Sequence, residues 1–302
     1  MPGSSGSSSS NAAGSSPSIS GFVFDGYLQG TTVYLDLNSD GIQDANEPTG
    51  VTNSGGYFSF DIEAGDETAP VVAVAGGVDV DTGEVFRGTL TAPAGSSTVS
   101  PITTLVHEVM QSGSVTKAQA VSYIQSALSL SGVDLLNVDP FAGAGNADLA
   151  KATTLLGSLM QVGGDDSEAD LILDTVTTKV LLQVTGSTIS PTFDLRAELK
   201  DETWVETTLT DAVPAMANIA LAAQVYSQKA TTIAQAASVD DLTTLQSGSN
   251  VVFGPDGSIT LSEGFSLNIS AEDADGQAIS GSGTVAITGV ETQQAADPAN
   301  RK

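Results

Sequence analysis

Alternation of apolar and polar residues predicts β-strands in the first third of the chain. Residues 32–37 and 57–62 alternate with a period of two, which places every second side chain on one face of a strand. Shorter apolar runs at 70–75 and 78–87 continue the pattern, and the second folds back at a turn. We therefore expect an antiparallel β region over residues 18–97.

From Ser100 onward the apolar period lengthens to about 3.6 residues, as in amphipathic helices. Ser100 is a plausible N-cap with Pro101 in the first helical position, and Gly113 ends the stripe. A capping box at Thr116–Gln119 begins a second helix. Further helices are expected at 147–162, 168–184 and 214–237. Together they predict an α-helical domain over residues 98–247, large enough for its own core.

Strand-like runs return after Gly248 and predict an antiparallel β segment over residues 248–290. A small sheet of this kind needs a partner to be stable. It could pack on the helical domain, complete the first sheet region or pair with another chain. The remaining segments read as a flexible Gly/Ser-rich tail at 1–17 and a polar tail at 291–302. The predicted fold class is α+β with several domains.

Residues 36–47 match the calcium-loop pattern D-x-[DN]-x-[DN]-G-x5-E at every specified position. Alternate residues of such a loop point inward, a glycine takes the sharp turn, and the residue after it offers its backbone carbonyl. Calcium accepts six to eight oxygen ligands at flexible geometry, whereas magnesium needs a stricter octahedron and zinc prefers nitrogen or sulfur. We therefore expect Ca²⁺, and the alternative is a solvated turn that binds nothing. The expected ligands are Asp36, Asn38, Asp40, Ile42, Asp44 and Glu47.

The loop lies between strand patterns, so its surroundings differ from an EF-hand. The runs 19–27 and 30–36, the loop, and Gly55–Phe58 resemble the Ig-like B-type repeats of bacterial surface adhesins and the related carboxypeptidase-regulatory-like sandwiches. The resemblance covers residues 18–92. It implies an antiparallel Ig-like β-sandwich with a structural calcium held by the six loop positions. The segment at 100–141 is similar to segments that follow such sandwiches in large secreted proteins of aquatic bacteria.

Composition narrows the possible partners. The chain has 36 acidic and 9 basic residues, a formal net charge of −27, which argues against nucleic acid or an anionic membrane as partner. Solubility or adaptation to salty surroundings explains the negative charge as well as a partner-binding role would. The chain has no cysteine, so it forms no disulfide, and it has no apolar run long enough to predict a transmembrane segment. The Gly/Ser-rich start fits the tail of a lipoprotein with a lipid anchor in its precursor, an expression tag or a fragment boundary.

Catalytic patterns are sparse. The one histidine, His107, reads as a helix-surface or packing residue, and no nucleophile elbow, zinc motif, Walker loop or dinucleotide fingerprint occurs. Glycosidase carboxylates can lie far apart in sequence, so hydrolysis stays an alternative. Trp204, the only tryptophan, reads as an anchor between helices. Residues 272–275 could ligate a second calcium, although a solvated turn fits them better.

The sequence thus predicts a calcium-stabilised structural or adhesive protein without catalytic activity, located outside the cell or on a bacterial surface. Its expected partners are other copies of itself, other surface proteins or polysaccharides. One alternative is a subunit of a surface layer or filament that assembles through exposed strand edges. Another is a polysaccharide-active hydrolase or a carbohydrate-binding lipoprotein.

Overall fold

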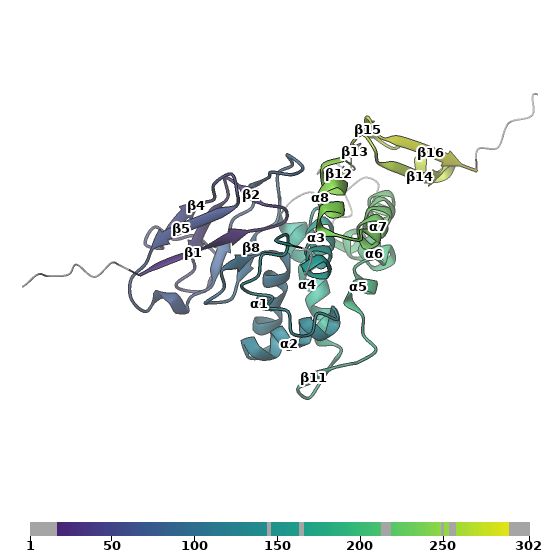
Figure 1. Ribbon diagram of the computed structural model, residues 1–302. Helices are drawn as coiled ribbons and strands as arrows, with labels where there is room; N and C mark the ends of the chain where they lie inside the picture. The colour runs from purple at the N-terminus through teal and green to yellow at the C-terminus, as the bar shows by residue number, and fades with distance from the viewer. Residues whose placement is uncertain are drawn as a thin grey trace, which may run out of the picture.

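The computed structural model describes residues 17–143, 146–162, 166–212, 219–248, 251–253 and 258–289. The two predicted tails therefore lie almost wholly outside the described residues, as do the start of the helix expected at 214 and the turn expected at 255–257. The fold is mixed α+β. β-sheets lie at one end, helices fill the middle, and a small β region projects from the other end (Figure 1).

Two larger sheets and a short ribbon form the N-terminal β region. The first sheet has the order β4-β3-β6-β8, the second has the order β5-β1-β9, and β2 pairs with β7. The strands are β1 (Ser18–Val23), β2 (Leu28–Gln29), β3 (Thr32–Leu35), β4 (Thr49–Val51), β5 (Tyr57–Asp61), β6 (Val71–Ala73), β7 (Val78–Asp79), β8 (Leu90–Ala92) and β9 (Thr98–Val99), with a 3₁₀ turn at Asp66–Thr68. The strands predicted at 32–37, 57–62 and 70–75 are confirmed with shorter bounds.

In β5 alternation puts the large apolar side chains inside, as predicted, whereas in β3 the intervening Tyr34 is also buried and Leu37, beyond the end of the strand, is 36% exposed. Val33 and Leu35 of β3 are fully buried, as is Phe58 of β5, whereas Tyr57 and Ser59 face outward. The antiparallel expectation is wrong at one pairing, because β1 runs parallel to β9. Parallel neighbours require a long connection, and the 74 residues between the two strands supply one. That these two sheets form an Ig-like sandwich stays a prediction.

The helices of the middle region begin where the caps are. In α1 the Ser100 side chain accepts from the Thr103 amide at 3.2 Å, and Pro101 is the first helical residue. In α2 the same box joins Thr116 and Gln119. Both starts are confirmed. The helices are α1 (Pro101–Gly113), α2 (Lys117–Ala127), α3 (Ala147–Met160), α4 (Asp166–Leu181), α5 (Leu195–Glu198), α6 (Glu202–Ala212), α7 (Ile219–Gln235) and α8 (Val239–Gly248), and the hairpin β10 (Val184–Thr185) with β11 (Thr188–Ile189) follows α4.

One continuous hydrophobic core joins the sheets to the helices. Leu90 of β8 and Ile102 and Leu105 of α1 are at most 1% exposed and belong to the same cluster. Hydrogen bonds tie the same elements together, because Thr91 donates its amide to the Thr104 hydroxyl at 2.9 Å. Trp204 packs partly buried against this core, as expected of an anchor, and donates to the Glu198 carbonyl at 2.7 Å.

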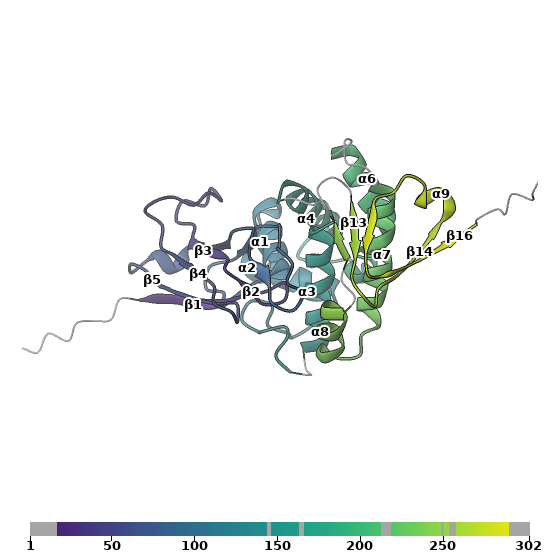
Figure 2. The ribbon, with the colours of Figure 1, turned by 90° about the horizontal axis from the view of Figure 1, so that it is seen from above.

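The C-terminal β region departs from the predicted antiparallel meander. β12 (Val251–Phe253) and β13 (Ile259–Leu261) are antiparallel, but β13 pairs in parallel with β15 (Ile279–Gly281), and β14 (Ser266–Ser270) in parallel with β16 (Thr284–Thr288). The short helix α9 (Ala271–Ala274) follows β14. Parallel strands cannot be joined by a tight hairpin, so in both parallel pairs a strand is joined to the next but one along the chain. Figure 2 shows this region beyond α7, far from β1.

Candidate calcium site

The candidate loop, residues 36–47, connects two antiparallel neighbours of one sheet. It begins directly after β3 and ends two residues before β4. Ser39 and Gly41 have φ angles of 58° and 74°, the left-handed conformation that glycine adopts without steric cost. These two residues turn the backbone sharply, so the loop folds over its own acidic side chains.

Two buried carboxylates hold the ends of the loop. Asp36 accepts from the amides of Asp40 at 3.2 Å and Gly41 at 3.0 Å. Glu47 accepts from the amides of Leu37 at 2.8 Å and Asp44 at 2.9 Å. Asp36 is 4% exposed and Glu47 is 6% exposed. Acidic residues are almost never this buried without a specific partner. Here the loop amides are such partners, and they hold both carboxylates inward.

Asn38 lies between the two remaining carboxylates. Its Nδ2 donates to Asp40 at 2.9 Å and to Asp44 at 3.1 Å. The amide nitrogen therefore occupies the place where both carboxylates converge, and its positive end partly offsets their charge. The side-chain oxygen of Asn38 accepts a hydrogen bond from the Asp40 backbone amide at 3.1 Å. A cation between Asp40 and Asp44 would require this side chain to turn its oxygen inward.

The loop creates a negative field that no ion pair among the described residues offsets. The ion pairs found there join Lys179 to Glu198 and Arg196 to Asp194, both in the helical region. Burial, together with the nearby charges of Asp36, Glu47 and Asp40, raises the pKa of the Tyr34 hydroxyl to about 12.

The carboxylate and amide oxygens of the loop are of the kind that calcium binds, although these side chains are not arranged around one point. Within the described residues, no group of three or more Asp, Glu or His side chains is positioned to hold a metal ion. The carboxylates instead accept hydrogen bonds from loop amides. Each carboxylate has about four lone-pair positions, so two or three hydrogen bonds leave capacity for a cation. Ile42, the expected carbonyl ligand, has a 66% exposed side chain and donates its amide to Asp40 at 2.8 Å.

The other candidates from the sequence occupy structural positions. His107 lies in α1, where burial lowers its pKa and the charge of Asp36 opposes that effect. Its Nδ1 is buried and finds no hydrogen-bond partner among the described residues, which agrees with a packing role. The second calcium candidate, residues 272–275, falls in α9 and the turn after it.

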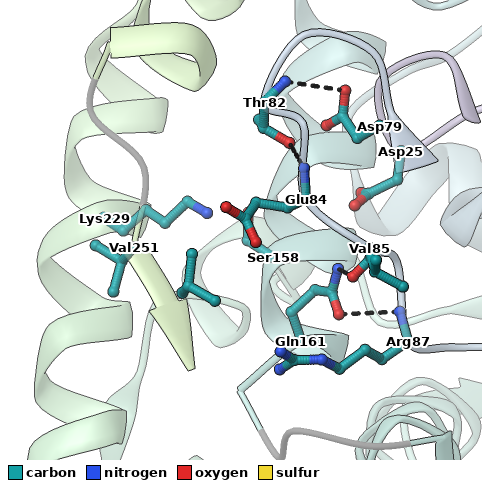
Figure 3. Close-up of a pocket in the computed structure, with 11 residues that line it drawn as sticks. Asp25, Asp79, Thr82, Glu84, Val85, Arg87, Ser158, Gln161, Lys229 and Val251 are labelled. Carbon is teal, nitrogen blue, oxygen red and sulfur yellow. Dashed lines mark hydrogen bonds between the residues drawn. The ribbon is translucent and has the colours of Figure 1, made fainter. Parts of the chain in front are cut away.

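A partly open charged cavity, which sequence reasoning missed, lies where the β region meets the helices. It is lined by Asp25, Asp79, Glu84, Ser158 and Lys229 among others, and has a volume of about 50 Å³. In Figure 3 the Lys229 side chain extends from α7 toward Glu84, with Asp25 and Asp79 on the far side. A space of this size holds a few water molecules and is too small for a sugar ring.

Burial shifts the pKa of Asp25 and of Lys229, which face this cavity from opposite sides. It raises the pKa of Asp25 well above its usual range, an effect that the Asp79 charge increases and Lys229 opposes. It lowers the pKa of Lys229, against the attraction of Asp25, Asp79 and Glu84. Asp25 presses against the α3 backbone, since a Cβ on Gly157 would lie 1.6 Å from its Oδ1. The one sequence signal was an aspartate directly after the apolar run at 22–24.

Comparison with known proteins does not assign the chain to a family. No family model, curated protein or solved structure matches the chain. Within the part of the chain that the structure describes, no helix combines the length and apolar character needed to cross a bilayer.

Proposed function

We propose that this chain is a calcium-stabilised structural or adhesive protein of the bacterial surface or extracellular space, without catalytic activity. The observation that carries the proposal is the pair of buried loop carboxylates, Asp36 and Glu47. Buried carboxylates repel one another and lose hydration, so a divalent cation is the partner that offsets both costs. Millimolar calcium is characteristic of extracellular surroundings and matches the affinity range of extracellular calcium modules.

The residues that would hold the ion come from three parts of the loop. Asp36 and Glu47 would supply carboxylate oxygens from its two ends, and Asp40 and Asp44 from its middle. Asn38 would contribute its side-chain oxygen after rotation. When bound, calcium would fix the connection between β3 and β4 by joining oxygens that repel one another without it.

Labelling of intact cells tests the proposed location. An antibody to the protein should label non-permeabilised cells that produce it, and a chelator in the wash should reduce the signal when calcium maintains the folded β region. Label that appears only after permeabilisation would contradict the surface assignment. Isothermal titration of the purified protein with calcium, compared with Asp40→Asn, tests the ligand separately.

A second candidate function, assembly through strand edges, has one specific observation in its favour. All five residues of β16 are exposed, and Val285 and Ile287 present 37% and 49% of their surface to solvent. Small two-stranded sheets are marginal by themselves, so this ribbon would gain stability from a partner strand. Light scattering in calcium and in chelator tests it: larger species that need calcium would favour assembly, and a monomer at every concentration would exclude it.

A further inference from the structure

A row of aromatic rings runs along the outer face of the β5-β1-β9 sheet. Phe22 of β1 and Tyr57 of β5 are direct cross-strand neighbours, with ring centroids 5.3 Å apart at 63°. Phe22 also stacks on Phe24 at 6.0 Å, and Phe24 contacts Tyr27 at 5.1 Å. The row therefore passes from solvent at Tyr57 to a fully buried ring at Phe24.

The exposed end of this row packs against buried neighbours. Phe22 and Tyr57 keep 37% and 38% of their surface exposed, whereas Phe24 behind them is 0% exposed. Gly21 lets the backbone of residue 97 approach closely, because a Cβ on Gly21 would lie 2.3 Å from the Ser97 carbonyl oxygen. Phe22 packs on both Phe24 and Tyr57, and side chains held by such packing have less freedom to lose when a ligand binds.

Polar groups lie beside the rings and, together with them, line a hollow of about 200 Å³. Its lining combines the two rings with Ser20, Ser97, Asn137 and Asp139. Asn137 is fixed by accepting from the Ser97 amide at 3.2 Å and donating to Asp134 at 3.1 Å. Asp139 is fixed by accepting from the Tyr27 hydroxyl at 2.8 Å and the Phe141 amide at 2.8 Å. Asp139 retains unused lone pairs, whereas the Asn137 side-chain oxygen already accepts from both the amide and the hydroxyl of Ser97, so Asn137 would serve a ligand as a donor through its Nδ2.

We propose that this hollow is a carbohydrate subsite, in which one residue of a neutral glycan stacks on Phe22 and Tyr57 and hydrogen-bonds to Asn137 and Asp139. A pyranose ring offers an apolar C–H face to the negative face of an aromatic ring and hydroxyl donors at its rim. Sites for such ligands pair apolar walls with a few fixed polar groups.

The negative charge of the rim and of the whole chain favours a neutral glycan over an anionic one. The rim carries Asp139, with Asp134 beside Asn137, and the whole chain has a net charge of −27. An anionic polysaccharide would meet repulsion both at the subsite and at long range. This inference deepens the adhesive function proposed above by naming its ligand class, and rests on that function.

The competing explanation is that the pair only stabilises the β1–β5 register, since cross-strand aromatic pairs contribute to sheet stability. Variants separate the two roles. Phe22→Ala and Tyr57→Ala remove the rings, whereas Tyr57→Phe retains the stacking surface. Val51→Ala, which shortens a 63% exposed side chain on β4, is the matched control for loss of exposed apolar surface.

The experiment is native gel electrophoresis of the full chain in gels containing β-glucan, xylan or galactomannan, with alginate as the anionic comparison. At least one neutral glycan should retard the wild type, Tyr57→Phe and Val51→Ala. Each ring deletion should weaken that apparent affinity by about tenfold or more, as for a central binding residue. Melting temperatures verify that every variant is folded.

Absence of retardation by all three neutral glycans would overturn the proposal. Equal retardation of the wild type and both ring deletions would do the same, as would retardation by alginate alone. None of these results bears on calcium binding, because the hollow and the loop share no residue. The calcium-dependent melting shift thus tests the proposed function independently.

Discussion

Removing one carboxylate from the loop should remove much of the stabilisation that calcium provides. The suitable variant is Asp40→Asn, because its new amide nitrogen can face the side chain of Asn38, and both residues are exposed, so that the lost hydrogen bond can be replaced by water. Asp36→Asn is less informative. One of its oxygens would become an amide nitrogen facing a backbone N–H donor, at a cost of about 1 to 3 kcal/mol even without calcium.

The magnitude follows from linkage. With a dissociation constant of about 0.1 to 1 mM, calcium at about ten times that value contributes about 1.4 kcal/mol. If Asp40→Asn weakens binding about tenfold, the same concentration contributes only about 0.4 kcal/mol. At about 2 to 4 °C per kcal/mol for a chain of this size, the wild-type shift is about 3 to 6 °C and that of the variant is about 1 °C.

Differential scanning calorimetry in calcium, magnesium and chelator measures these shifts. Asp211→Asn is the control, because it makes the same chemical change at an exposed position in α6, outside the β region that holds the loop. It should keep the full wild-type shift, and magnesium should substitute poorly in all three proteins. A wild-type melting temperature that is indifferent to calcium up to about ten times the assumed dissociation constant would refute the metal assignment.

Three further predictions concern buried and charged groups of the fold. Tyr226 donates to the carbonyls of Leu155 and Leu199, so Tyr226→Phe should lower the free energy of unfolding in urea by about 1 to 3 kcal/mol; Tyr123→Phe should cost little, because the buried Tyr123 hydroxyl has no hydrogen-bond partner among the described residues. Gly157→Ala forces a methyl group against Asp25 and should cost about 1 to 3 kcal/mol, whereas Gly55→Ala, where only an Asn53 oxygen at 3.5 Å is near, should cost far less. Burial and the charges of Asp166 and Asp174 raise the pKa of Asp170 from 3.8 to about 6, so its contribution to stability is lost as pH rises from about 4 to about 6, and Asp170→Asn should flatten the pH dependence of the urea midpoint over that window; an unchanged slope would contradict this.

Elements specified by neighbouring residues were predictable from the sequence. The starts of α1 and α2 follow from side chains that cap amides three residues away, so both were found at the correct residue. The strands β3 and β5 follow from alternation alone. The direction of strand pairing is not local. Nothing near β14 or β16 in sequence specifies that they run parallel, so the antiparallel meander predicted for this region is wrong.

The same distinction separates the sites. The candidate calcium loop is a contiguous pattern, so its expected ligands can be named from the amino-acid sequence, and their binding of the ion stays a prediction. The charged cavity brings Asp25 and Asp79 together with Lys229, more than 100 residues away along the chain, and only the packing of α7 on the β region reveals it. The aromatic hollow likewise needs the segment carrying Asn137 and Asp139 to pass beside β1.

Because one hydrophobic core joins the sheets to the helices, it determines which thermal transitions calcium should shift. Thr89 of the segment before β8 donates its amide to Asp166 of α4 at 2.6 Å, and Leu90 shares one core cluster with Ile102 of α1. The loop connects β3 to β4, and β3 reaches β8 through β6 in the same sheet. Elements joined by one core and by hydrogen bonds unfold together. Calcium should therefore raise the melting of the helices along with that of the sheets, so circular dichroism at a helix-sensitive wavelength should report the same shift as calorimetry. A helical transition that stays fixed while a separate β transition moves would mean that the two regions unfold independently, despite the core they share.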